Sequence, residues 1–91
     1  MSSRNRDEVV MTPVQSKMAR AATELRIGDV AKRAQVSTGT IVRFERGEAL
    51  KPRTVEAIQR AYEEAGIEFI DGDAPGVKLH VRVVPARKKK K

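Results

Sequence analysis

Residues 29–47 read DVAKRAQVSTGTIVRFERG, and this stretch decides the fold class. Its pattern predicts two short helices, over about 27–34 and about 38–46, joined by a tight connection. Ser37 suits the N-cap of the second helix, because its hydroxyl can accept a hydrogen bond from the first turn. Gly47 can end that helix in a left-handed conformation. The spacing is that of a helix-turn-helix motif.

The inward-facing residues of this motif are apolar and mostly small. Ala31 and Ala34 allow the two helices to cross closely, and Val36 can fill the turn between them. Ile41 and Phe44 are expected to anchor the second helix on a core. This leaves its N-terminal outer face small and polar, and such a face can enter the DNA major groove. An ordinary helical hairpin in a small bundle has the same pattern, so the spacing alone leaves both interpretations open.

Further helices are expected on both sides of the motif. Thr12 and Pro13 form a helix start. Apolar residues follow at helical spacing and predict a first helix over about 13–24; they are Val14, Met18, Ala21 and Leu25. A fourth helix is expected over about 53–65 and is closed by Gly66. The inward residues expected in it are Val55, Ile58, Ala61, Tyr62 and Ala65, with the hydroxyl of the tyrosine at the rim of the core.

The pattern changes after residue 66. Apolar and polar residues alternate with a period of two, and a turn-rich segment at 71–76 separates two strand-like runs. We therefore expect a β-hairpin over 67–84, with strands at 67–70 and 77–84. Residues 1–11 are expected to be a disordered arm and residues 85–91 a basic tail, which leaves 12–66 as the helical domain.

Composition excludes several classes of function. The 91-residue chain contains no Cys and one His, so thiolate metal sites, disulfides and a Ser/His/Asp arrangement are not expected. We predict no enzyme activity, no metal and no cofactor. No membrane span or signal peptide is expected, and a cytoplasmic location follows. The net charge of +7 favours a polyanionic partner, although a merely soluble basic protein has the same balance.

The motif residues, together with MARAA at 18–22 and KPRT at 51–54, resemble the Cro/phage-repressor family, also called the xenobiotic-response-element family. The resemblance covers about residues 12–66. In particular, the segment GIEFIDGDAPGV at 66–77 is similar to the C-terminal extension of short bacterial regulators of this family. The resemblance implies a mainly α fold, a four-helix repressor-like bundle followed by the hairpin, and double-stranded DNA as the partner.

The resemblance also implies which residues touch DNA. Thr38, Gly39 and Arg43 take the positions that face base edges, and the arginine can bond guanine O6 and N7 in a fork. Phosphate contacts are implied for Ser37, Thr40, Arg46, Lys51, Arg53 and Arg20. Arg20 and Glu45 match a family pair that joins the first helix to the end of the third. We expect this ion pair to orient Arg20 toward the DNA backbone.

Two positions depart from the family pattern. Residues 26–28 (RIG) replace the usual Ser-Gln start of the second helix. In the family the side-chain amide of that glutamine contacts a phosphate, and this contact is not expected here. Gln35 stands where glycine is usual in the turn, which predicts a left-handed glutamine or a slightly altered turn.

The hairpin is expected to need a packing partner, because two isolated strands are marginal in water. We favour a homodimer with the hairpins at a symmetric interface, which would set two recognition helices about 34 Å apart on DNA. The interface residues expected are Phe69, Val77, Leu79, Val81 and Val83. Packing within one chain, in a monomer, is the alternative.

The leading functional hypothesis is a transcriptional regulator that binds an inverted-repeat operator as a homodimer, acting at the nucleoid. The alternative is the antitoxin of a toxin–antitoxin pair, which binds a partner protein and its own promoter. In that case the hairpin or the basic tail would bind the partner protein.

Overall fold

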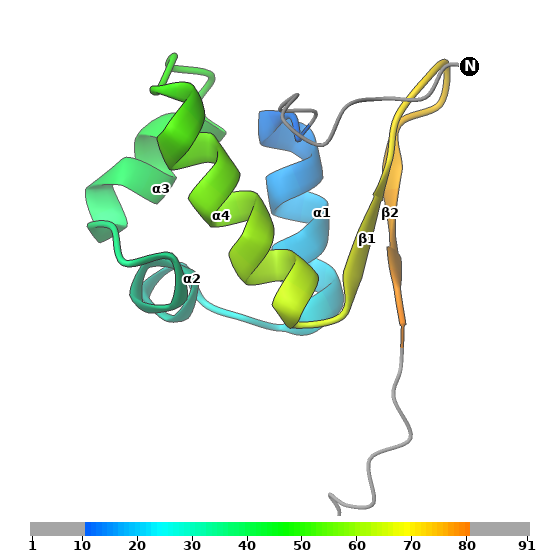
Figure 1. Cartoon of the computed structure of the whole chain (residues 1–91), viewed down its shortest axis with the longest axis horizontal. Helices are drawn as coiled ribbons and strands as arrows, with labels where there is room; N and C mark the ends of the chain where they lie inside the picture. The colour runs from blue at the N-terminus through cyan, green and yellow to red at the C-terminus, as the bar shows by residue number, and fades with distance from the viewer. Residues whose placement is uncertain (1–10, 81–91) are drawn as a thin grey trace, which may run out of the picture.

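The structure is a computed structural model and describes residues 11–80. This part of the chain consists of four helices and a two-stranded antiparallel sheet. Residues 1–10 of the predicted arm and the predicted tail at 85–91 lie outside it. Figure 1 shows the hairpin on one side of the helices and α3 on the opposite side. The elements are α1 (Pro13–Thr23), α2 (Ile27–Ala34), α3 (Thr38–Glu45), α4 (Pro52–Glu64), β1 (Ile67–Ile70) and β2 (Gly76–Leu79). The predicted mainly α fold with a C-terminal hairpin is confirmed.

α1 begins with a capping box. The backbone N–H of Gln15 donates to Thr12 Oγ1 at 3.2 Å, and Gln15 Oε1 accepts from the Thr12 N–H at 2.9 Å. The apolar residues whose spacing predicts this helix do not form its buried face. Val14 and Met18 are 57% and 36% exposed, whereas the buried side chains are those of Gln15, Ser16 and Ala19. The polar pair is tolerated inside because both side chains are hydrogen-bonded.

The turn between α2 and α3 has the conformation that its sequence suggests. Gln35 is left-handed, with φ of 61°, and its N–H bonds back to the end of α2. Ser37 Oγ accepts from the N–H of Thr40 at 3.1 Å and so caps α3. At the start of α2 no N-cap side chain bonds the first turn, and Asp29 Oδ2 accepts from the Arg26 N–H at 3.0 Å.

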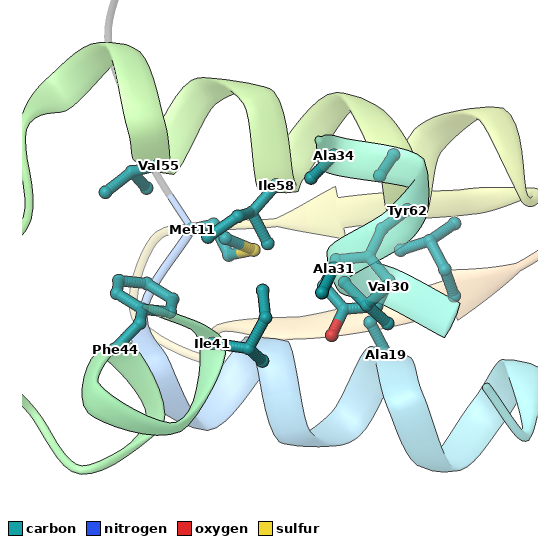
Figure 2. Close-up of a cluster of buried hydrophobic side chains, with 12 residues drawn as sticks. Met11, Ala19, Val30, Ala31, Ala34, Ile41, Phe44, Val55, Ile58 and Tyr62 are labelled. Carbon is teal, nitrogen blue, oxygen red and sulfur yellow. The ribbon is translucent and has the colours of Figure 1, made fainter. Parts of the chain in front are cut away.

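One core joins all the helices to the start of the hairpin (Figure 2). Its buried apolar residues are Met11, Ala19, Val30, Ala31, Ala34, Ile41, Phe44, Val55, Ile58, Ala61, Tyr62 and Ile67. Met11 corrects the predicted arm boundary, since its side chain is buried among these residues and is part of the folded domain. Tyr62 is also corrected, because its hydroxyl is fully buried with the ring instead of lying at the rim.

The hairpin packs on its own chain. Phe69 pairs with Val77 in the register, both lie against the core, and Phe69 meets Tyr62 edge-on with ring centroids 6.1 Å apart. β1 packs against α4, and β2 packs mainly against α1. The predicted second strand, 77–84, is described as Gly76–Leu79, while Val81 and Val83 lie outside the described residues. Two of the five residues expected at a dimer interface therefore serve the core of their own chain.

Candidate nucleic-acid interface

The outer face at the start of α3 is a connected polar surface. Ser37, Thr38 and Arg43 are exposed, and Gly39 and Thr40 are partly exposed. The hydroxyls of Ser37 and Thr40 are 2.9 Å apart, and Arg43 Nη2 donates to Thr40 Oγ1 at 3.5 Å. Nothing in the described part of the chain covers Ser37 and Thr38, so this surface meets the steric requirement for entry into a groove of DNA.

The Arg43 side chain lies close to Gly39. A Cβ on Gly39 would lie 3.4 Å from Arg43 Nη1 and 3.8 Å from Ser37 Oγ. The guanidinium thus folds back along α3 toward the helix start. Its five N–H donors are presented on the same surface as the two hydroxyls.

Glu48, in the loop after α3, contacts two of the basic residues. Its carboxylate lies 3.8 Å from Arg43 Nε and 3.7 Å from Arg46 Nη1, and all three side chains are about half or more exposed. Such exposed pairs are weak, so both guanidinium groups remain available to another anion. Glu48 was not among the predicted site residues, although an acidic residue directly after Arg46 and Gly47 favours an ion pair with a neighbouring arginine.

Arg20 is bound to the last residue of α3. Arg20 Nε and Nη2 donate to the two carboxylate oxygens of Glu45 at 3.0 and 2.7 Å, which is the predicted ion pair in bidentate form. The carboxylate is almost fully buried, while the arginine side chain is 27% exposed. One edge of the guanidinium is therefore fixed, and the rest of it reaches the surface.

Two further residues support Glu45 from the core. Ser16 Oγ donates to Glu45 Oε2 at 2.7 Å, and it lies 3.0 Å from the Tyr62 hydroxyl. Because the serine proton goes to the carboxylate, the tyrosine is the donor to Ser16. This chain of contacts could not be predicted from the sequence, since a serine on a helix gives no signal of a distant partner.

The pKa values of this cluster follow from burial and hydrogen bonding. Burial raises the pKa of Glu45, but hydrogen bonds from Arg20 and Ser16 outweigh it, so the net pKa lies below the usual 4.5. The hydrogen bond with Glu45 raises the pKa of Arg20. Burial raises the pKa of Tyr62 to about 12. At neutral pH the cluster is therefore a carboxylate, a guanidinium and a neutral phenol.

The remaining predicted phosphate-binding residues lie at the start of α4. Lys51 is the N-cap of α4, Arg53 is in its first turn, and both side chains are exposed. The structure thus places the predicted DNA-contacting residues on α3, on the loop after it, on the start of α4 and on α1. Within residues 11–80 no group of three or more His, Cys, Asp or Glu residues is arranged to hold a metal ion.

A helix-turn-helix fold with an exposed basic surface defines a class of nucleic-acid-binding module. The model of the helix-turn-helix domain family matches residues 17–68, which is more than half of the chain. The protein therefore belongs to the helix-turn-helix domain family, and this membership indicates a DNA-binding regulator. The family is typically non-enzymatic. No curated protein matches the chain closely enough to count as a relative.

No helix within residues 11–80 combines the length and the apolar character that crossing a membrane requires.

Proposed function

We propose that this protein is a sequence-specific transcriptional regulator that inserts the start of α3 into the major groove of double-stranded DNA. The observation that carries the proposal is the exposed, connected face of Ser37, Thr40 and Arg43 inside the matched helix-turn-helix region. Arg43 reads a guanine through a bidentate contact, and Thr38 contacts a base or a phosphate. Gly39 reads nothing itself and allows close approach of the helix.

Phosphate contacts hold the protein in register. Arg46, Lys51 and Arg53 supply cations beside α3, and Arg20 supplies one from α1 while its other edge is held by Glu45. Ser37 and Thr40 contribute hydroxyls at the helix start. Contacts of this kind set the affinity and its salt dependence and carry little sequence information.

The bidentate Arg20–Glu45 pair also supports assignment of the chain to the Cro/phage-repressor group, because the resemblance to that group implies this pair. We propose a homodimer on an inverted-repeat operator, which acts by occupying a site at which RNA polymerase is blocked or recruited. Such a regulator works at the nucleoid.

The test is selection of bound sites from random duplex DNA with the full chain, followed by affinity measurements on the winning site. A palindromic winner is expected. Arg43→Ala should lose about 1–3 kcal/mol of discrimination at one base position. Lys51→Ala should weaken binding to all sequences alike and reduce the salt slope by about 1. Unchanged affinities of Arg43→Ala for both operator and random DNA would refute the assignment of the recognition helix.

One observation favours the antitoxin alternative. Val14, Met18 and Leu79 are exposed apolar side chains, which a partner protein would cover. Co-expression with the genes next to its own, followed by purification of a stable heteromeric complex, would support this function. A homodimer with nanomolar operator affinity and no copurifying protein would contradict it.

A further inference from the structure

A chain of hydrogen bonds runs from Tyr62 through Ser16 and Glu45 to Arg20. The Tyr62 hydroxyl lies 3.0 Å from Ser16 Oγ, and Ser16 Oγ donates to Glu45 Oε2 at 2.7 Å. The same Oε2 accepts from Arg20 Nε at 3.0 Å, while Oε1 accepts from Arg20 Nη2 at 2.7 Å. The family resemblance implies the Arg20–Glu45 pair alone, so Ser16 and Tyr62 are additional members. We call these four residues the Arg20 cluster.

Ser16 bonds across the molecule instead of within its own helix. A serine or threonine inside a helix commonly turns its hydroxyl to solvent or to the carbonyl four residues earlier. Thr23 in α1 does so, and its Oγ1 donates to the Ala19 carbonyl at 2.8 Å. Ser16 is fully buried, and its hydroxyl reaches the last residue of α3. Tyr62 donates to the same oxygen, which leaves the one serine proton directed at Glu45.

This third donor fixes the carboxylate that binds Arg20. A bidentate pair fixes the guanidinium relative to the carboxylate, but the two groups can still turn together about the bonds of the glutamate side chain. Ser16 and Arg20 lie four residues apart on one face of α1, and both bind Glu45 Oε2. The Glu45 side chain is only 7% exposed, where hydrogen bonds are strengthened by the low local dielectric. Loss of the serine hydroxyl therefore frees a rotation of the whole pair.

Arg20 keeps donors for a further partner. A guanidinium has five N–H groups, and two of those on Arg20 bind Glu45, so three remain without an acceptor within residues 11–80. Glu45 is the last residue of α3 and is followed by Arg46, which is also predicted to bind phosphate. The free edge of Arg20 thus lies at the end of α3. Such an edge suits the oxygens of a DNA phosphate when its direction is fixed.

Stability alone gives no reason for this cluster. The cost of desolvating two charges offsets most of their attraction, and apolar side chains of the same volume give a core of similar or greater stability. Apolar packing is at hand, because the ring of Tyr62 lies in the core and meets Phe69 edge-on (Figure 2). Hydrogen-bonded residues behind a binding group serve to hold it in one geometry. The Arg20 cluster has this arrangement.

We propose that Ser16 and Tyr62 are positioning residues for the phosphate contact of Arg20. They fix the rotation of the Glu45 carboxylate, and the carboxylate directs the free edge of the guanidinium at one backbone phosphate in each half-site. A side chain that is ordered before binding loses less conformational entropy when it meets the phosphate. The inference rests on the proposed function and extends it from the contacting residue to the two residues behind it.

Neutralising single phosphates of the selected operator tests this role. A methylphosphonate replaces one charged oxygen by a methyl group, and a set of duplexes carries it at each position in turn. The wild type should lose affinity at every phosphate that it contacts, and Arg20→Gln should lose this sensitivity at one position per half-site. Ser16→Ala should bind the unmodified operator about three- to tenfold more weakly. Its sensitivity should shrink at the Arg20 position and stay as in the wild type at all others.

Thr23→Val is the matched control on the same helix. It removes a hydroxyl that bonds to backbone groups of Ala19, Arg20 and Leu25 and not to the Glu45 carboxylate. A loss of stability alone should therefore appear in this variant as well, whereas its phosphate profile should equal that of the wild type. All affinities are measured at a temperature at which circular dichroism shows every variant folded.

Tyr62→Phe is the second test variant. It keeps the ring and its contact with Phe69 and removes the hydroxyl that donates to Ser16. It should reproduce the Ser16→Ala pattern in weaker form, with a two- to threefold loss of affinity, on the order expected for a less direct hydrogen bond. This variant decides the matter if Ser16→Ala does not fold.

The free protein provides a measurement without DNA. The Arg20 Nε–H signal in nuclear magnetic resonance spectra, identified by its absence from Arg20→Gln, should exchange slowly with solvent because it is bonded to a buried carboxylate. Exchange should be about tenfold faster in Ser16→Ala, faster to a smaller extent in Tyr62→Phe, and unchanged in Thr23→Val. An unchanged rate in Ser16→Ala would overturn the positioning role. Equal affinity losses at every phosphate position in Ser16→Ala and Thr23→Val would overturn it too.

The two measurements separate this inference from the proposed function. A wild type that binds no duplex refutes the function and the phosphate contact with it, while the exchange rates still decide whether Ser16 and Tyr62 fix Arg20. Specific DNA binding with the same phosphate profile in Ser16→Ala as in the wild type refutes the inference alone.

Discussion

The guanidinium of Arg43 lies over Gly39, four residues earlier in α3, with Nη1 3.4 Å from the position of a Cβ on that glycine. A methyl group at residue 39 would therefore fit beneath the guanidinium at ordinary van der Waals distance. A glycine inside a helix lowers helix stability, so its presence here costs stability and leaves the backbone at the start of α3 open.

Gly39→Ala separates these two effects. The alanine methyl would touch only the flexible ends of Arg43 and Ser37 side chains. We expect urea unfolding to show a gain of up to about 1 kcal/mol from helix propensity. Affinity for the selected operator should fall, because a methyl group at residue 39 hinders the close approach of α3 to DNA that the proposed function requires. A variant with unchanged operator affinity would show that binding does not need this close approach at residue 39.

Glu48→Gln removes the carboxylate that Arg43 and Arg46 share. We expect affinity for both operator and random DNA to rise a few-fold at low salt and the gain to vanish at high salt, where exposed charges are screened. Fluorescence anisotropy across a salt series measures this. Glu64→Gln changes the net charge equally at the last residue of α4 and is the control, which should leave DNA affinity nearly unchanged. Equal gains in both variants would mean that Glu48 acts only through net charge.

Glu45→Gln tests the buried cluster through pH. The pKa of Glu45 is lowered in the folded chain, so its contribution to the free energy of unfolding is present above pH 4.5 and lost as pH falls below that value. The variant should lose about 2 kcal/mol at pH 7, since charged hydrogen bonds are broken. The difference from wild type should shrink in acid, as followed by urea unfolding at each pH. A difference that is constant from neutral pH to pH 2 would contradict the assignment.

Gln15→Met tests the attachment of the hairpin to α1. The change keeps the side-chain length and removes the donor for the carbonyls of Ile70 and Gly76, and a lost buried partner costs about 1–3 kcal/mol. Hydrogen exchange should speed up in β1 and β2. Gln59→Met is the matched control, because the Oε1 atom of Gln59 is buried without a partner among the described residues. The control should cost little, and equal losses in both variants would refute the special attachment at Gln15.

The sequence predicts the elements whose boundaries are set by local chemistry. Ser37 caps α3, Gln35 and Gly47 take left-handed conformations, and Thr12 opens α1, each through contacts within a few residues. The Arg20–Glu45 pair was predicted only through a family resemblance, because its partners are distant in sequence.

The buried face of α1 could not be predicted in the same way. Gln15 and Ser16 are inside because they meet partners in the hairpin and in α3, 29 to 61 residues away. Apolar spacing points to Val14 and Met18 instead, which are exposed in the single chain. Met11 likewise packs through contacts that its neighbours in sequence do not reveal.

The hydrogen-bonded hydroxyl of Tyr62 has a practical consequence for solution work. The chain has one tyrosine and no tryptophan, so its near-ultraviolet absorption and emission report mainly on this ring. The phenol is hydrogen-bonded to Ser16, which donates to the carboxylate of Glu45 at the end of α3. A spectroscopic probe is therefore already present where α3 meets α1 and α4, and duplex titrations can follow that junction without any added label.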